Sequence, residues 1–248
     1  MSKVIITVEN LNASFNHRKI LHNVSFTANQ NEITVILGRS GCGKTTVMKH
    51  MIGLYPLQTG NISIFGESLS MLDEHDRAKL LLKMGVLFQN GALLNSCTIA
   101  ENVSIPLQQH TNFSQEVIDD IVRIKLKSVG LAQALDLFPA ELSGGMRKRA
   151  ALARAMVMDP PLLFCDEPSA GLDPVTLETL DTLILQLKKQ LGTTIILITH
   201  EVSSIFRLAD RIIFMDSGSV LYEGDLPLAL KSDIKPMKEF FEKAKGKG

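Results

Sequence analysis

The sequence lacks a net charge and long apolar runs, and each lack argues against a class of protein. Lys plus Arg and Asp plus Glu both number 26, so the formal charge at pH 7 is zero. Nucleic-acid binders usually carry a strongly basic surface, so we expect no DNA or RNA partner. Apolar stretches such as 80–82 and 195–198 are far shorter than the roughly 18 to 20 residues of a membrane-spanning helix. We expect a chain that does not cross a membrane by itself.

Cysteine is also scarce. Cys42, Cys97 and Cys165 form no CxxC pair and have no histidine at metal-ligand spacing. Such a scattered, odd-numbered set predicts neither a structural disulfide nor a zinc site. The first ten residues, MSKVIITVEN, hold one Lys and no long apolar core, unlike a secretory signal. We therefore expect the protein to stay in the cytoplasm.

The composition that remains is that of a globular protein. Of 248 residues, 45% are hydrophobic and 21% are charged, which excludes disorder and is enough for a sizeable core. Two β-like runs at 3–9 and 20–28 predict an antiparallel hairpin. Next, an apolar run at 33–37 precedes a helical stretch at 44–51. This alternation predicts parallel strands covered by helices.

A helical region interrupts the alternation. Between residues 91 and 158 the β-like runs thin out, and residues 114–129 and 143–158 have helical periodicity, with Ser143 as the expected N-cap of the second. Residues 194–199 and 201–209 then resume the strand and helix order. The pattern predicts an α/β fold with a helical insert.

A glycine-rich segment between the first apolar run and its helix has the pattern of a phosphate-binding loop. Residues 38–45, GRSGCGKT, match GxxxxGK followed by Ser or Thr. Backbone N–H groups of such a loop wrap phosphate oxygens, and the helix N-terminus adds positive potential. We expect Lys44 to contact the β and γ phosphates of ATP and the Thr45 hydroxyl to bind Mg²⁺. The predicted nucleotide-binding residues here are Gly38, Arg39, Ser40, Gly41, Cys42, Gly43, Lys44, Thr45 and Thr46.

A later apolar run, residues 162–165, ends in two adjacent carboxylates, Asp166 and Glu167. Alone, this pattern would also suit a solvated strand end. Beside a phosphate loop, we interpret Asp166 as the side chain that holds Mg²⁺, directly or through water. Glu167 then polarises the water that attacks the γ-phosphate.

Residues 142–146, LSGGM, resemble the LSGGQ signature of ABC ATPases, with Met146 in place of the usual Gln. Other motifs of that family follow in order along nearly the whole chain: an A-loop aromatic at Phe15, a Q-loop at Gln89, a D-loop at residues 169–173 that ends in Asp173, and a switch histidine at His200. Taken singly, Phe15 also suits a core aromatic, Gln89 a strand end and His200 a core or capping histidine. The resemblance rests on their order.

The resemblance implies a fold and a domain organisation. The fold is α/β: a P-loop NTPase (RecA-like) core with an N-terminal antiparallel β subdomain and an inserted α-helical signature subdomain. Residues 1–248 form a single ABC ATPase domain, in which 1–90 and 159–230 make up the β subdomain and the core. Residues 91–158 are the helical subdomain, and residues 231–248 are a C-terminal helical tail.

The resemblance also implies the roles of the site residues and a head-to-tail homodimer. Each ATP lies between Lys44 of one subunit and Ser143 and Gly145 of the other. The implied catalytic residues are Glu167, His200, Gln89 and Lys44. Besides the phosphate loop, the implied nucleotide-binding residues are Phe15, Gln89, Ser143, Gly144, Gly145, Asp166 and Asp173, and the implied Mg²⁺ ligands are Thr45, Gln89 and Asp166.

Within the ABC family, residues 142–155 and 89–94 resemble the ATPases of Mce or Mla lipid transporters, although Leu94 and Asn95 replace an expected Phe and Asp. This implies transport of phospholipid or another hydrophobic molecule between the inner and outer bacterial membranes. The implied partners are an integral membrane permease that docks near residues 89–106, an Mce-type substrate-binding protein and a STAS-type subunit. The implied location is the cytoplasmic face of the inner membrane. An ABC ATPase for another cargo and a non-transport ABC switch remain as alternatives.

Two further stretches leave alternatives open. The basic residues 147–149 lie beside a nucleotide site, and we expect them to neutralise phosphate or contact another subunit rather than bind nucleic acid. In the tail, Met237, Phe240, Phe241 and Ala244 fall on one face of a helix. This apolar stripe packs on its own subunit, on the partner subunit or on a membrane. Our hypothesis is that it helps hold the dimer.

Overall fold

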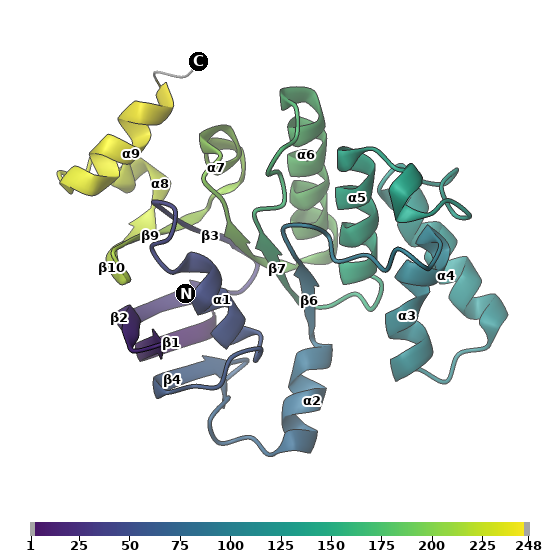
Figure 1. Ribbon diagram of the computed structural model, residues 1–248, viewed down its shortest axis with the longest axis horizontal. Coiled ribbons are helices and arrows are strands. Elements are labelled where there is room, and N and C mark those ends of the chain that lie inside the picture. The colour runs from purple at the N-terminus through teal and green to yellow at the C-terminus, as the bar shows by residue number, and fades with distance from the viewer. Residues whose placement is uncertain (1–2, 246–248) are drawn as a thin grey trace.

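The computed structural model describes residues 3–245, which form two sheets and a group of helices (Figure 1). The first sheet has four strands in the order β2-β1-β4-β5. Its members are β1 (Val4–Phe15), β2 (Arg18–Asn29), β4 (Thr59–Ile64) and β5 (Glu67–Ser68). The predicted hairpin is confirmed, but pairing continues beyond residue 9 through register shifts. Asn10 and Asn23, both with positive φ, lie near these shifts, and Asn tolerates that conformation better than most residues.

The second sheet has six strands in the order β10-β9-β3-β8-β7-β6. All neighbouring pairs are parallel except β9 and β10. Its strands are β3 (Ile33–Gly38), β6 (Met84–Leu87), β7 (Leu162–Asp166), β8 (Thr194–Ile198), β9 (Arg211–Asp216) and β10 (Ser219–Asp225). Every residue of β3, β7 and β8 is buried, which explains why these strands are continuous apolar runs in the sequence. The predicted parallel strands are confirmed.

Helices connect these strands. They are α1 (Lys44–Met51), α2 (Glu74–Leu82), α6 (Pro174–Leu191) and α7 (Val202–Leu208). Between β6 and β7 come α3 (Ile99–His110), α4 (Gln115–Ser128), a short 3₁₀ turn (Pro139–Glu141) and α5 (Gly144–Ala155). The inserted helices lie together at one end of the molecule (Figure 1). They enclose a hydrophobic cluster of their own, and Leu93 and Leu183 pack against both this cluster and the one that the six-stranded sheet forms with α6 and α7.

Helix α5 ends at Ala155 rather than continuing to residue 158 as the periodicity predicted. The chain reaches Pro160 and Pro161 shortly afterwards. Proline lacks the N–H that a helix needs and disfavours helical conformation in the residue before it. The apolar periodicity therefore extends beyond the last hydrogen-bonded turn.

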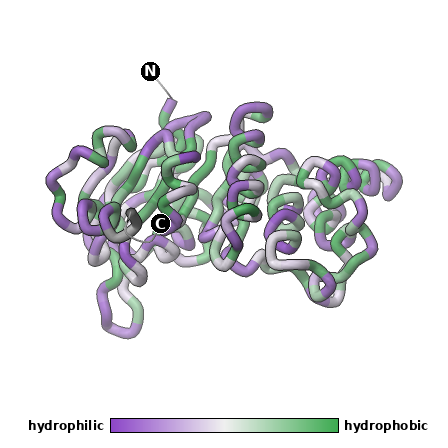
Figure 2. Tube along the Cα trace, turned by 90° about the horizontal axis from the view of Figure 1, so that it is seen from above, coloured by the Kyte–Doolittle hydropathy of each residue, from purple (hydrophilic) through white to green (hydrophobic). Residues whose placement is uncertain are grey.

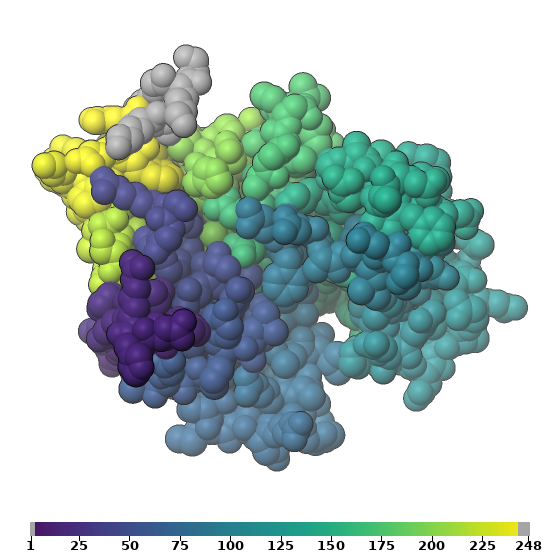
Figure 3. All heavy atoms as spheres, in the orientation of Figure 1, coloured from purple at the N-terminus to yellow at the C-terminus, as the bar shows by residue number. Residues whose placement is uncertain are grey.

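The C-terminal part contains α8 (Leu226–Ala229) and α9 (Lys235–Lys245). Met237 and Phe241 are buried in the cluster that the six-stranded sheet forms with α6 and α7, and the ring centroid of Phe240 lies 5.8 Å from that of Phe214. The apolar stripe of the tail thus packs on its own subunit; the side chain of Ala244 lies outside the described residues. Figure 3 shows α9, in yellow, against the segment that follows β3.

Hydropathy follows this architecture, with hydrophobic residues along the central strands and hydrophilic residues on the outer loops (Figure 2). Within residues 3–245 no helix has the length and hydrophobicity of a membrane span. All three cysteines are free, as predicted.

Candidate active site

A cavity of about 730 Å³ opens at the carboxyl edge of the six-stranded sheet. Ligands of open α/β sheets bind at this edge because the loops after the strands meet there. The residues that line the cavity are Phe15, Ile20, Gly38, Arg39, Ser40, Gly41, Gly43, Lys44, Thr45, Thr46, Tyr55, Gln89, Glu167, His200 and Phe240. The fold therefore brings most of the predicted nucleotide-binding residues of the phosphate loop to one place.

The phosphate loop curves around the Lys44 side chain, which is only 8% exposed. Its Nζ donates hydrogen bonds to the carbonyl oxygens of Gly38 at 2.9 Å and Arg39 at 3.1 Å. Gly43 has a φ of 103°, and a Cβ there would lie 2.6 Å from Leu21 Cδ2. Only glycine adopts this conformation at such a close approach without strain. The loop and its lysine are thus fixed by β2 and by the loop's own carbonyl groups.

At the start of α1, the Thr45 hydroxyl donates a hydrogen bond to Asp166 Oδ1 at 3.1 Å. Asp166 is the last residue of β7 and is 5% exposed. Burial raises the pKa of its carboxyl group, and the Thr45 hydrogen bond opposes that shift. A hydroxyl and a carboxylate from different segments are therefore held together beside the phosphate loop.

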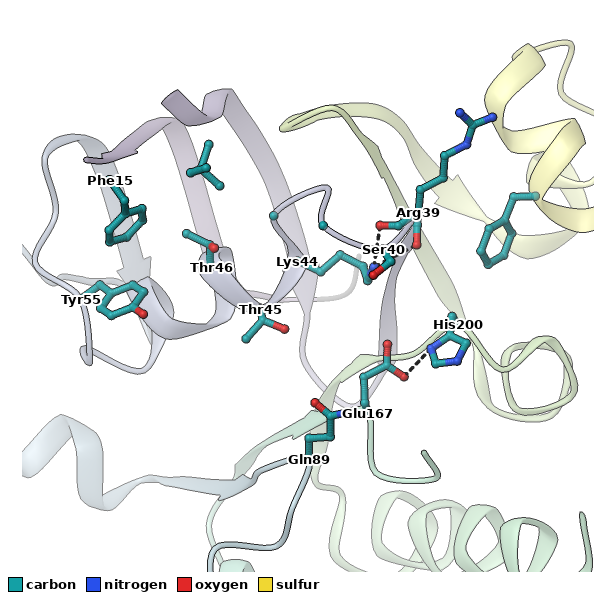
Figure 4. A pocket seen from close by; sticks show the side chains of 15 residues that line it. Phe15, Arg39, Ser40, Lys44, Thr45, Thr46, Tyr55, Gln89, Glu167 and His200 are labelled. Atoms are coloured by element: carbon teal, nitrogen blue, oxygen red, sulfur yellow. Dashed lines mark hydrogen bonds and ion pairs between the residues drawn. The ribbon is translucent and has the colours of Figure 1, made fainter. Parts of the chain in front are cut away.

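Three predicted catalytic residues follow the ends of three neighbouring strands. Gln89 follows β6, Glu167 follows β7 and His200 follows β8. Figure 4 shows them at the same end of the cavity. His200 Nδ1 lies 2.9 Å from Glu167 Oε2, and the Glu167 side chain is 13% exposed. The imidazole therefore lies against a nearly buried carboxylate.

The opposite end of the cavity is aromatic (Figure 4). The ring centroids of Phe15 and Tyr55 lie 5.1 Å apart, and Phe15 is 37% exposed. Lys49 Nζ lies 5.3 Å from the centroid of the Tyr55 ring. Phe15 is thus no core aromatic but part of an exposed aromatic pair. Tyr55 was not predicted because it lies in an irregular loop after α1 and carries no motif.

The C-terminal helix also reaches the cavity. Arg39 of the phosphate loop forms an ion pair with Glu239 of α9, with 2.5 Å between Nη2 and Oε2. Phe240 lines the cavity beside it. Sequence reasoning assigned these tail residues no place near the nucleotide. No local signal could have found the contact, since about two hundred residues separate its two sides.

The signature residues lie elsewhere on the same chain. Ser143 caps α5, and its hydroxyl accepts a hydrogen bond from the Met146 N–H at 3.2 Å. Ser143 and Gly144 are exposed, whereas a Cβ on Gly145 would lie 2.2 Å from Thr176 Cγ2. None of the three lines the cavity described above.

Asp173, at the end of the D-loop, caps α6. Its carboxylate accepts hydrogen bonds from the N–H groups of Val175 and Thr176, both at 3.1 Å. Together with the Thr176 hydroxyl, the largest contributor, these bonds lower the pKa of Asp173. Its observed contacts are therefore those of a helix cap.

The basic residues 147–149 each donate a hydrogen bond to a backbone carbonyl of their own chain. Arg147 bonds to Leu142 at 2.8 Å and Arg149 to Val129 at 2.8 Å. Lys148 bonds to the carbonyl of Gln89. These contacts fasten α5 to its surroundings within the chain.

Comparison with known proteins decides the family. A family model described as ABC transporter matches residues 21–170, which include the phosphate loop, the signature and the start of the D-loop. The chain belongs to the ABC transporter family. It is therefore an ABC ATPase, which binds and hydrolyses ATP.

Two relatives and one solved structure are similar over most of this ABC ATPase. The intermembrane phospholipid transport system ATP-binding protein MlaF of Haemophilus influenzae is 36% identical over 98% of this chain and 92% of its own length. The probable ribonucleotide transport ATP-binding protein mkl of Mycobacterium tuberculosis is 38% identical over 96% of this chain. The chain spans only 66% of that relative's length.

The solved structure is the ATP-binding cassette MJ0796 in a dimeric post-hydrolysis state, bound to ADP and Pi. It superimposes with a TM-score of 0.82 at 28% identity, over 90% of this chain and 99% of its own. The predicted fold class is confirmed.

Proposed function

We propose that this chain is the ATP-hydrolysing subunit of a transporter that moves phospholipid or another hydrophobic molecule between bacterial inner and outer membranes. The observation that carries the cargo assignment is the similarity to MlaF, which extends over 98% of this chain and 92% of that protein. The match to mkl is slightly higher in identity but leaves a third of that protein uncovered. Because mkl is named a probable ribonucleotide transport protein, a nucleotide is the second candidate cargo.

The geometry of the cavity supports a specific placement of ATP. The adenine ring stacks on Phe15, beside Tyr55, because aromatic rings bind bases through their faces. The phosphates lie in the loop 38–45, where N–H groups and Lys44 neutralise their charge. The γ-phosphate then points toward Glu167 at the other end of the cavity.

Glu167 acts on the attacking water in this proposal. Its carboxylate orients the water and accepts its proton, and His200 holds that carboxylate in place at 2.9 Å. Gln89 lies beside them, and its side-chain amide would be a further polar group near the γ-phosphate.

Thr45, Gln89 and Asp166 also fit a Mg²⁺ site. They offer a hydroxyl, an amide and a carboxylate oxygen, and Mg²⁺ prefers oxygen ligands of this kind together with phosphate oxygens and water. The hydrogen bond between Thr45 and Asp166 holds two of these donors side by side. Mg²⁺ would neutralise charge on the β and γ phosphates.

We further propose a head-to-tail homodimer, in which Ser143, Gly144 and Gly145 of one subunit bind the ATP held by the other. The exposed start of α5 supports this, since a capped helix start with two glycines suits an anion and lies away from the chain's own cavity. Asp173 would lie near the same interface. The dimeric state of MJ0796 is consistent with it.

The remaining partners complete the proposed transporter. An integral membrane permease would dock near residues 89–106, between the core and the helical subdomain 91–158. A cavity of about 460 Å³ supports this position, with Leu82, Met84, Pro106 and Met158 among its lining residues. An outer-lying Mce-type substrate-binding protein and a small cytoplasmic STAS-type subunit would complete the complex, with this chain at the cytoplasmic face of the inner membrane.

Purification of the tagged protein from its native membrane tests this proposal. We expect a permease and an Mce-type protein to co-purify, and phospholipid to be identified by mass spectrometry of the extracted complex. A permease accompanied by a nucleotide-binding or another soluble substrate-binding protein would support a different cargo. Recovery without any membrane protein would contradict the transport function while leaving the ATPase activity intact.

A further inference from the structure

Lys148 is a buried lysine that links the signature helix to the catalytic end of the cavity. It lies in α5, a little over one turn after Ser143, and is 8% exposed. Its Nζ donates hydrogen bonds to two main-chain carbonyl oxygens, those of Gln89 and, at 3.5 Å, of Glu167. One ammonium group thus contacts the main chain of the Q-loop and of the proposed general base, rather than the Glu167 carboxylate.

Glu167 needs such support because of its backbone. Its φ is +45°, a left-handed conformation that costs free energy in a residue with a Cβ and persists only where the surroundings impose it. The Glu167 N–H donates to the Ile198 carbonyl at 2.8 Å, and the Glu167 carbonyl accepts from the Ala170 N–H at 3.2 Å. Lys148 adds a second donor to that same carbonyl. The contacts on the carbonyl side fix the direction in which the Glu167 side chain leaves the strand.

The charge of Lys148 is balanced by its surroundings. Burial lowers the pKa of its ammonium group, because the charged form loses water there, while the carboxylates of Glu167 and Asp166 favour the charged form. An ammonium group has three N–H donors and no acceptor. It therefore suits a position between two carbonyl oxygens, and a neutral side chain of equal length would leave both of them without this donor.

Neighbouring basic side chains do not make the same link. Arg149 bonds to the Val129 carbonyl within the inserted helices. Arg154 donates to the carbonyls of Gly91 and Ala92, at 2.8 Å each, and so holds only the loop after β6. Of these basic residues of α5, Lys148 is the one that contacts the loop of Gln89 and the main chain of Glu167 at the same time.

We infer that Lys148 is a positioning residue for ATP hydrolysis, which ties Gln89 and the main chain of Glu167 to the helix that carries the signature. This inference rests on the proposed roles of Glu167 and of the signature. The start of α5 is the surface proposed to bind the ATP of the partner subunit. Any rotation of α5 on closure there moves Lys148, and with it the water-orienting groups of the chain's own site. Each chain thereby couples one ATP site of the dimer to the other.

The test compares Lys148→Met with Lys127→Met in the purified full-length protein. Met keeps an apolar stem close to that of Lys but donates no hydrogen bond. We expect Lys148→Met to lower kcat by about tenfold to a hundredfold, as for a misplaced catalytic group, while KM for ATP changes by less than about threefold. Lys127→Met makes the same substitution at an exposed position of α4, and its kcat should stay within about twofold of the parent. Lys148→Arg, which restores the donor, should recover most of the rate.

A double variant separates positioning from general destabilisation. If Lys148 acts through Glu167, adding Lys148→Met to Glu167→Gln should slow single-turnover hydrolysis by less than about twofold beyond Glu167→Gln alone. A multiplicative loss, a parent-like kcat in Lys148→Met, or an Arg variant as slow as the Met variant would each overturn the inference. If the parent hydrolyses ATP and Glu167→Gln does not, the proposed function stands even when one of these outcomes overturns the role of Lys148. An active Glu167→Gln would instead remove the proposed role of Glu167, and this inference with it.

Discussion

Two glycine-rich helix starts in this chain have the same chemistry and opposite surroundings. The phosphate loop before α1 is enclosed by its own chain: Lys44 is buried against two loop carbonyls, and Thr45 bonds to Asp166 of another strand. The signature before α5 makes a local cap, and Ser143 and Gly144 face solvent. Both starts present N–H groups suited to an anion. The difference fits the proposal that the signature of one subunit binds the ATP held in the phosphate loop of the other.

The largest expected effect concerns the enclosed site. Glu167→Gln should keep ATP binding, because the amide keeps the shape of the side chain. It should lower hydrolysis by about 10² to 10⁴, as expected for loss of a general base. Equilibrium binding measures the ATP affinity, and the rate of phosphate release measures hydrolysis.

Glu201→Gln is the matched control for that variant. Glu201 lies 3.7 Å from His200 on the ring nitrogen opposite to Glu167, and its side chain is 39% exposed. We expect its hydrolysis rate to stay within about twofold of the parent. Equal losses in both variants would show that the environment of His200, and not the Glu167 carboxylate, limits the rate.

Mixing a chain mutated in the phosphate loop with a chain mutated in the signature tests whether the two subunits share each ATP site. Lys44→Ala and Ser143→Arg should each abolish ATP-driven dimerisation. Their mixture should regain ATP-driven dimerisation in part, because a mixed dimer has one intact site of two, whereas neither mutant alone has any. Sedimentation velocity with ATP measures this. Mutants that behave in the mixture as they do alone would contradict a shared site.

The two signature glycines, Gly144 and Gly145, differ in how closely other residues pack against them. A Cβ on Gly145 would lie 2.2 Å from Thr176 Cγ2, whereas on Gly144 its nearest neighbour is Leu172 Cδ2 at 3.9 Å. Gly145→Ala should therefore destabilise the monomer by about 1–3 kcal/mol, the usual cost of overpacking. Gly144→Ala should leave its melting temperature unchanged or slightly raised, since Ala favours helix more than Gly. Thermal unfolding without nucleotide compares the pair, and equal melting temperatures would place the close contact between Gly145 and Thr176 of α6 in doubt.

At the far end of the enclosed site, Phe15→Ala should weaken ATP binding by about 1 to 3 kcal/mol, the value of one base stacked on an aromatic ring. Phe15→Tyr should be nearly neutral, because the ring face is kept. ATP affinity measured beside thermal stability separates the two roles. A lower melting temperature with unchanged affinity would show that the ring only packs on Tyr55.

The sequence predicts the enclosed helix start well because its determinants are local. Residues 33–45 combine a buried apolar strand with a motif whose glycines and lysine act within a few residues of one another. The contacts that sequence reasoning missed join distant segments: Phe15 with Tyr55, and Lys148 with Gln89 and Glu167. The periodicity and spacing of an aromatic or basic residue in the sequence do not indicate which distant residue it contacts. Only the packing of α1 on the first sheet, and of α5 on the second, brings these pairs together.

The smallest expected effect concerns the contact that α9 adds to the enclosed site. Arg39 and Glu239 are 52% and 36% exposed, and such ion pairs contribute less than about 1 kcal/mol. Glu239→Gln should therefore change thermal stability little, and Glu242→Gln, at an exposed position of the same helix, is its control. Because Met237 and Phe241 are already buried in their own subunit, we also expect Glu239→Gln to leave dimerisation without nucleotide unchanged. Sedimentation against concentration tests this, and a weakened dimer in Glu239→Gln alone would revive the hypothesis that the tail holds two subunits together.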